Sequence, residues 1–164
     1  MELKYPLAPT LPFKTMKKNA GFTLIEILIA MLVLAVGLLG LAGMQATSLK
    51  NNQSAYNRSR ATQLAYDLAD RMRANVIGKA SYTAILPSSA AEQKVCSSVT
   101  TICTFVDMAQ NDLFEWNSSL ISSLPSGIGT ISVLGDIYTI RITWDDDQDG
   151  NDANNPNFQT SFQL

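Results

Sequence analysis

Histidine is absent from this 164-residue sequence, and cysteine occurs only twice, at Cys96 and Cys103. Without histidine a Ser-His-Asp triad cannot form, and two cysteines cannot by themselves complete a tetrahedral zinc site. Charge is also scarce, because Asp, Glu, Lys and Arg make up 16% of the chain and the formal net charge is −2. That balance excludes a strongly basic nucleic-acid-binding protein. We therefore expect neither an enzyme nor a nucleic-acid partner.

The scarcity of charge leaves one long apolar run, from Phe22 to Met44. As a helix, its residues, about 23 of them, would measure roughly 34 Å, which matches a bilayer core. Four lysines precede the run, and no basic residue follows it until Lys50. The positive-inside rule therefore predicts a single-pass protein with a cytoplasmic N-terminus and an exported C-terminal part.

A secretory signal peptide is the simplest alternative for a basic segment followed by an apolar run. The run is too long for such a peptide, however, and the helical pattern continues beyond it. A stripe at mostly helical steps extends as far as residue 76, through Leu49, Tyr56, Arg60, Ala61, Leu64, Ala65, Leu68, Met72 and Val76. We expect one helix of about 50 residues, membrane-embedded in its first half and amphipathic in its second.

A single carboxylate, Glu26, interrupts the apolar run, and it is the only charged side chain between Phe22 and Leu49. A charged side chain at the centre of a bilayer costs at least ~2.5 kcal/mol, so this residue needs an explanation. One explanation is that it snorkels to the membrane surface from the first turn of the helix. The other is that it meets a cation in a bundle of such helices.

The segment KKNAGFTLIEILIAMLVLAVGLLGLAG, residues 17–43, resembles the prepilin signature of type IV pilins and type II secretion pseudopilins. In that signature a basic leader ends in Gly, a Phe becomes the new N-terminus, and a Glu is the fifth residue after the cut. The resemblance implies that prepilin peptidase cleaves between Gly21 and Phe22 and methylates the amine of Phe22. It also implies that Glu26 pairs with the amine of a neighbouring pilin during assembly.

The leader is longer than is usual in the family and contains three prolines. An internal start at Met16 would give the leader MKKNAG, of the usual length. Two origins remain for residues 1–15: a start codon placed too early, or an extension of the leader.

Three glycines recur at every third position in the apolar run, at Gly37, Gly40 and Gly43. Each costs about 1 kcal/mol of helix propensity relative to Ala. Close packing against another helix is one explanation, although the usual motif has a spacing of four. Local loosening of the helix in a filament, as the pilin resemblance implies, is the other.

Beyond Gly78 the helical pattern stops, and the composition predicts a small folded head. In an exported chain, Cys96 and Cys103 are expected to form a disulfide, with free buried thiols as the alternative. A second helix is predicted for residues 105–125, followed by strands at 129–134, 137–144 and 158–164. Gly135 and Asp136 suit a tight hairpin turn between the first two strands.

This order of elements, with the pieces DLFEWNSSLISSLPSG and ITWDD, resembles the PilV family of minor pilins, the type IV pilus modification proteins. The resemblance implies an α+β type IV pilin fold, with a long N-terminal helix packed on a small antiparallel sheet. Its expected parts are a prepilin leader at 1–21, a transmembrane and assembly helix at 22–45, an amphipathic continuation at 46–78 and a globular head at 79–164.

The function implied by this resemblance is that of a minor pilin, incorporated into a type IV pilus or priming its assembly, with adhesion or motility as the output. A minor pseudopilin of a type II secretion system is the alternative. The expected partners are prepilin peptidase and other major and minor pilins. The protein is expected in the bacterial inner membrane with a periplasmic C-terminal domain, and then in the pilus at the cell surface.

An acidic segment near the C-terminus, DDDQDGND at residues 145–152, is a further candidate site. Asp145, Asp147, Asp149 and Gly150 match the first half of a calcium-binding loop, where alternate carboxylates surround a hard cation. The second half does not match, because the twelfth position is Pro156 instead of Glu. Either the three aspartates bind calcium or the segment is a solvated acidic turn, and no other cofactor is expected.

Overall fold

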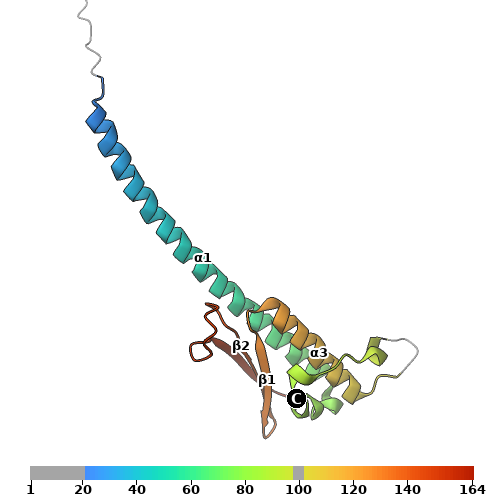
Figure 1. Ribbon diagram of the computed structural model, residues 1–164. Helices are drawn as coiled ribbons and strands as arrows, with labels where there is room; N and C mark the ends of the chain where they lie inside the picture. The colour runs from blue at the N-terminus through green and yellow to red at the C-terminus, as the bar shows by residue number, and fades with distance from the viewer. Residues whose placement is uncertain (1–20, 98–101) are drawn as a thin grey trace, which may run out of the picture. The chain divides into compact units, whose positions relative to one another are not determined.

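The structure is a computed structural model that describes residues 21–97 and 102–164 (Figure 1). Most of the predicted leader, including Met16, lies outside the described residues. The expected α+β fold is confirmed: a long N-terminal helix precedes a shorter helix and a three-stranded antiparallel sheet. The helices and strands are α1 Leu24–Ala74, α2 Ser81–Ala84, α3 Phe105–Ser123, β1 Ile128–Leu134, β2 Ile137–Thr143 and β3 Asn157–Gln163, with 3₁₀ helices η1 Val76–Gly78, η2 Pro87–Ser89 and η3 Lys94–Ser97.

The chain forms two compact units, Met1–Gln45 and Ala46–Leu164. In the first unit, every described side chain is exposed within the protomer, although nearly all are apolar. Leu, Ala and Met have high helix propensity and no proline interrupts them, so the segment is helical from Leu24 onward. An 18-residue window of α1 has a mean hydropathy of 2.8 with none of it buried, which is long and apolar enough to cross a membrane.

The three glycines of the apolar run have no packing role inside the protomer. A Cβ atom added at Gly37, Gly40 or Gly43 would meet nothing within 4 Å. Two explanations therefore remain for these glycines: contact with a helix of another molecule, or local loosening of α1 itself.

The second unit has one hydrophobic core, to which α1, α3 and the sheet contribute. From α1 comes a face at helical spacing: Asn57, Ala61, Leu64, Ala65, Leu68, Ala69 and Met72. The facing residues of α3 and β2, together with the residue after β2, are Ala109, Leu113, Trp116, Leu120, Tyr138, Ile140, Ile142 and Trp144. Trp116 Nε1 also donates a hydrogen bond of 2.8 Å to the carbonyl oxygen of Leu64, which joins α3 to the backbone of α1.

The buried face of α1 is shorter than the stripe that the sequence predicts. Leu49 and Tyr56 are 70% and 56% exposed, and Val76 beyond the helix is 44% exposed. The burial begins at Asn57, which is only 1% exposed. The packed face therefore starts at a polar residue.

The end of α1 also differs from the prediction, because the helix stops at Ala74 instead of Gly78. The cause is the side chain of Asn75, which donates to the carbonyl oxygen of Phe105 at 2.8 Å and accepts from the amide of Gly78 at 3.3 Å. An Asn side chain that bonds to nearby backbone in this way competes with helical hydrogen bonding. The chain consequently continues as η1 and turns toward the start of α3.

The sheet has the order β1-β2-β3, and both neighbouring pairs are antiparallel. The predicted strand positions are correct to within a residue at each end. Gly135, with φ +61°, and Asp136 form the two-residue turn between β1 and β2, as expected for a hairpin turn with glycine at its first central position. In β2, Tyr138, Ile140 and Ile142 face the core and the intervening residues do not.

Candidate assembly site

Glu26 occupies the first turn of α1, where Thr23 starts the helix. Its backbone amide donates to the carbonyl oxygen of Thr23 at 3.1 Å, and the Thr23 hydroxyl lies 3.4 Å from the same amide. A carboxylate in this position is favoured by the positive end of the helix dipole. The Glu26 side chain itself is exposed and forms no salt bridge with any described residue.

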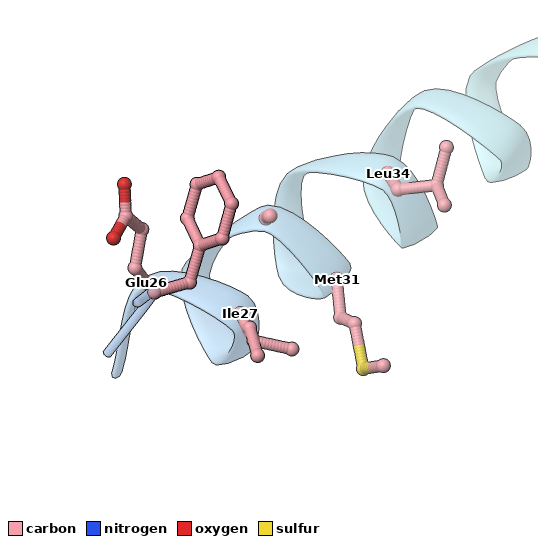
Figure 2. Close-up of a pocket in the computed structure, with 6 residues that line it drawn as sticks. Glu26, Ile27, Met31 and Leu34 are labelled. Carbon is pink, nitrogen blue, oxygen red and sulfur yellow. The ribbon is translucent and has the colours of Figure 1, made fainter. Parts of the chain in front are cut away.

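An apolar groove surrounds this carboxylate and follows one side of the helix. It is lined by Phe22, Glu26, Ile27, Ala30, Met31 and Leu34. These residues recur at intervals of three and four, the spacing of neighbours on a helix surface. Figure 2 shows Glu26 at the start of the helix and Ile27, Met31 and Leu34 following along it. The groove thus combines one anionic group with an apolar surface.

This arrangement is unstable in an apolar environment unless a cation is supplied. An ionised carboxylate that is removed from water without a partner costs several kcal/mol, and a paired one costs far less. The exposed apolar residues around Glu26 require such an environment, whether lipid or other helices. The site is therefore suited to binding a cationic group that belongs to an apolar molecule or helix.

The predicted disulfide between Cys96 and Cys103 is present in the second unit. The two Cα atoms are 4.8 Å apart, and the two residues are separated by seven positions in sequence. Thr104, directly after Cys103, caps α3: its hydroxyl accepts from the amide of Asp107 at 3.2 Å, and Asp107 accepts from the Thr104 amide in return. The disulfide therefore fixes η3 beside the capped start of α3.

Two family models match adjoining parts of this chain. The model described as Prokaryotic N-terminal methylation motif matches residues 16–42, and the model described as Type IV pilin Tt1218 matches residues 43–114. The chain is a type IV pilin-like protein. The methylation motif covers Phe22, Glu26 and the whole groove, and it implies processing by prepilin peptidase and assembly with other pilins. No curated protein and no solved structure matches the chain.

The pilin family is structural rather than enzymatic, which agrees with the expectation from composition. The apolar helix and the methylation motif also indicate that this pilin-like protein is anchored in a membrane.

The acidic segment of this pilin-like protein lies between β2 and β3, and its aspartates converge. One carboxylate oxygen each from Asp145, Asp147 and Asp149 can be chosen such that all three lie within 4.8 Å of one another. Asp145 is buried, and the other two are exposed. Gln148 and Gly150 have positive φ angles of 57° and 72°, which turn the loop back on itself.

A buried polar contact between the acidic loop and α1 could not be found from the sequence. Asn57 Nδ2 donates to Asp146 Oδ1 at 2.8 Å, and Trp144 Nε1 donates to the same oxygen at 3.0 Å. Gln53 Nε2 in turn donates to Asn57 Oδ1 at 3.1 Å. We call Gln53, Asn57, Trp144 and Asp146 the loop latch. Its one sequence signal is an Asn at a position where the helical stripe has apolar residues.

Burial raises the pKa of Asp146, but hydrogen bonds from Ser54, Asn57 and Trp144 and the charge of Lys50 outweigh it and hold the pKa below the usual range. The latch is therefore made with an ionised carboxylate at neutral pH, and charge-assisted hydrogen bonds are the stronger kind.

A second polar cluster connects α1, α2 and α3. Arg71 forms salt bridges with Asp112 at 3.1 Å and Glu115 at 2.7 Å, and Tyr82 donates a hydrogen bond of 2.5 Å to Asp112. The hydrogen bond from Arg71 lowers the pKa of Glu115, and it outweighs the opposing effect of burial. Burial and the bond to Asp112 raise the pKa of Tyr82, so its hydroxyl stays protonated and acts as a donor. The cluster joins α1, α2 and α3 within the second unit.

Proposed function

We propose that this protein is a minor pilin of a type IV pilus. Prepilin peptidase cleaves between Gly21 and Phe22 and methylates the new amine, and α1 then moves from the inner membrane into the filament. The observation that carries the proposal is Glu26: a carboxylate without a salt-bridge partner in the described chain, set in an apolar groove one turn after the cleavage point.

The cleavage supplies the missing cation. A new α-amino group at Phe22 is positively charged at neutral pH, with or without one methyl group. In the membrane this amine lies near the lipid headgroups. In a filament, contacts with neighbouring pilin helices replace the contacts with lipid. The amine of one subunit then meets Glu26 of the next. Because an unpaired charge in that core is costly, the pairing fixes the axial position of the incoming subunit.

The same pairing explains why a fully exposed apolar helix does not simply stay in lipid. The apolar residues of the first unit are equally well covered by acyl chains or by other pilin helices, so burial alone favours neither. The charge pair favours the filament, because only there does Glu26 find a second subunit's amine. The charge pair therefore favours transfer of the subunit from the membrane into the filament.

The export of the second unit agrees with its disulfide. Lysines precede the apolar run, so residues 46–164 cross to the periplasmic side, where disulfides form and persist. The protein is thus a single-pass inner-membrane protein before assembly and a pilus component at the cell surface afterwards.

The assignment to PilV-like minor pilins rests on the order of the elements and on the segments DLFEWNSSLISSLPSG and ITWDD, residues 142–146. Here Trp144 is 1% exposed and donates to Asp146, so two of the five residues form a defined structural unit. A minor pseudopilin of a type II secretion system would use the same cleavage and the same Glu26. The two alternatives differ in the filament that contains the protein, and the experiment below uses sheared pili for that reason.

The decisive experiment compares Glu26→Ala with wild type in the ratio of this protein in sheared pili to that in membranes. We expect a fall of at least about tenfold, since leaving one charge of a buried pair uncompensated costs about 3–5 kcal/mol. Membrane insertion should be unchanged or slightly improved, because the span becomes more apolar.

Two controls isolate the charge pair. Intact mass should show that both proteins begin at N-methylated Phe22, which separates an assembly defect from a processing defect. Glu92→Ala removes an exposed carboxylate of the head and should assemble as wild type does. An unchanged ratio for Glu26→Ala would mean that Glu26 only snorkels, and absence of the wild-type protein from sheared pili would favour the pseudopilin.

A further inference from the structure

The three aspartates of the acidic loop create a concentration of negative charge and form no salt bridge with any described cation. One carboxylate oxygen of each aspartate lies within 4.8 Å of the other two, which is close enough for one cation to contact all three. Among residues 21–97 and 102–164, the salt bridges involve other carboxylates only. Water can solvate the exposed carboxylates of Asp147 and Asp149, but the carboxylate of Asp145 is buried.

Asp145 is 5% exposed, and one of its two oxygens has no hydrogen-bond partner among the described residues. Its Oδ2 accepts from the amide of Gly150 at 3.0 Å, whereas its Oδ1 is buried without a donor. An ionised oxygen that is buried without a donor has lost its hydrogen bonds to water, and no other hydrogen bond replaces them. A cation among the three carboxylates would supply the missing interaction.

The position of Asp145 relative to α3 adds to its need for positive charge. Its backbone amide donates to the carbonyl oxygen of Pro125 at 2.9 Å, which holds it just beyond the C-terminal end of α3. The carbonyl groups at a helix C-terminus carry partial negative charge. Asp145, Ser122, Ser123 and Gln148 also line one cleft of the second unit, from which water can reach the loop.

We propose that the acidic loop binds one calcium ion, with Asp145 Oδ1 as its inner ligand and carboxylate oxygens of Asp147 and Asp149 as its outer ligands. Calcium accepts six to eight oxygen ligands in flexible geometry and completes its shell with water, whereas magnesium demands a near-ideal octahedron. The loop has Pro156 where a full calcium loop has a bidentate Glu. We therefore expect the weak affinity of extracellular modules, with a Kd of about 10⁻⁴–10⁻³ M.

The ion would act on α1 through the loop latch. Asp146 lies between two of the proposed ligands, and its Oδ1 is the atom that accepts from both Asn57 and Trp144. Calcium that fixes Asp145 and Asp147 also fixes the backbone of Asp146, and so holds this oxygen against Asn57 of α1. Binding would thus tighten the connection between the acidic loop and the first packed turn of α1, without touching α1 itself.

The test uses the full mature chain in detergent micelles, titrated with calcium chloride while the Tm and the heat of binding are recorded. We expect one ion per chain and a Tm rise of roughly 3–6 °C at ten times the Kd, which magnesium chloride at the same concentration does not reproduce. Hydrogen exchange at α1 residues 53–57 should slow in calcium by at least about threefold, because local opening there requires the latch to break.

Matched variants locate the site. Asp147→Asn and Asp149→Asn change exposed side chains and should fold normally, yet each should abolish most of the Tm rise. Asp152→Asn, in the same loop but outside the cluster, should keep it. Asn57→Ala should keep calcium binding but lose the slowed exchange in α1. An unchanged wild-type Tm at about 10 mM calcium, an equal response to magnesium, or a rise that survives Asp147→Asn would overturn the proposal; the first outcome would assign a water molecule to Asp145 Oδ1.

Discussion

Residues 24–45 and residues 46–74 belong to the same helix, yet their side chains have opposite relations to the rest of the chain. In the first part the apolar residues cover all sides and every one is exposed. In the second part polar residues occupy most of the surface, and one face at helical spacing, from Asn57 to Met72, is buried in the head, although Leu49, Tyr56 and Tyr66 stay exposed. Among the described residues, the more hydrophobic part is thus the one whose side chains are all exposed.

The difference shows that a high apolar content and a buried position are separate properties of a sequence. Burial in the protomer follows the period of the apolar residues, because only a face can be matched by α3 and a sheet. Continuous apolar character instead assigns a helix to an environment that surrounds it, a bilayer or a bundle. Three alanines in the second part, Ala61, Ala65 and Ala69, belong to this buried face and are at most 1% exposed.

The sharpest test of this comparison is the same substitution in each part. Leu68→Ala removes a side chain that is 0% exposed and should lower the free energy of unfolding of the head by about 2–5 kcal/mol. Leu38→Ala removes one that is 57% exposed and should leave it unchanged. Denaturant unfolding of both variants in the same micelles, followed by tryptophan fluorescence, measures the two values. Equal losses would mean that the two parts unfold together and that the comparison fails.

A second test asks how much of the stability of the head depends on the Cys96–Cys103 disulfide, which lies in the second unit. Replacing both cysteines, Cys96→Ser with Cys103→Ser, should cost about 2–3 kcal/mol through loop-closure entropy. The ring spans a sequence separation of 7 and lies within the second unit. Thermal unfolding with and without reductant should show the loss in wild type and no effect of reductant in the variant. Membrane insertion should be the same for both, and a defect in insertion would contradict the separation of the two parts.

The smallest expected effect concerns pH. The folded-state pKa of Glu115 is lowered, chiefly by its hydrogen bond from Arg71 of α1, so its contribution to stability is present above the unfolded pKa of about 4.3. It is lost as the pH falls through the lower folded value. Glu115→Gln should therefore lower the free energy of unfolding at pH 7 by no more than about 1 kcal/mol, because the pair is half exposed, and the difference from wild type should shrink as the pH falls through the lowered folded-state pKa. Glu92→Gln is the matched control, and an equal pH response in both would contradict the role given to Arg71.

The sequence predicted those features that depend on local periodicity. The helical spacing of Ala61, Leu64, Leu68 and Met72 gave their common face, and the alternation of Tyr138, Ile140 and Ile142 predicted a strand with one buried side. The prepilin signature predicted the family because its residues are contiguous. The cleavage point and the role of Glu26 remain predictions, since they concern a processed chain and a neighbouring subunit.

Features that depend on distant residues were not predictable. Helix α1 stops at Ala74 because Asn75 finds the carbonyl oxygen of Phe105, which is 30 positions away. The loop latch joins Asn57 to Asp146 across 89 positions. The spacing of the acidic loop was visible in the sequence, but the burial of Asp145 was not, because it depends on the end of α3.

The partners of the packed face of α1 all come late in the chain. The carbonyl oxygen of Leu64 accepts a hydrogen bond from Trp116, which follows it by 52 residues. Asn57 donates to Asp146 in the loop after β2, which follows it by 89 residues. As the chain is made and exported, this face emerges first and remains uncovered until α3 and β2 have followed. Contacts of such long range make folding slow, and an apolar face that is exposed in the meantime is prone to associate with other chains. A helix shared between anchor and head therefore imposes a folding order, in which the first element made is the last to be covered.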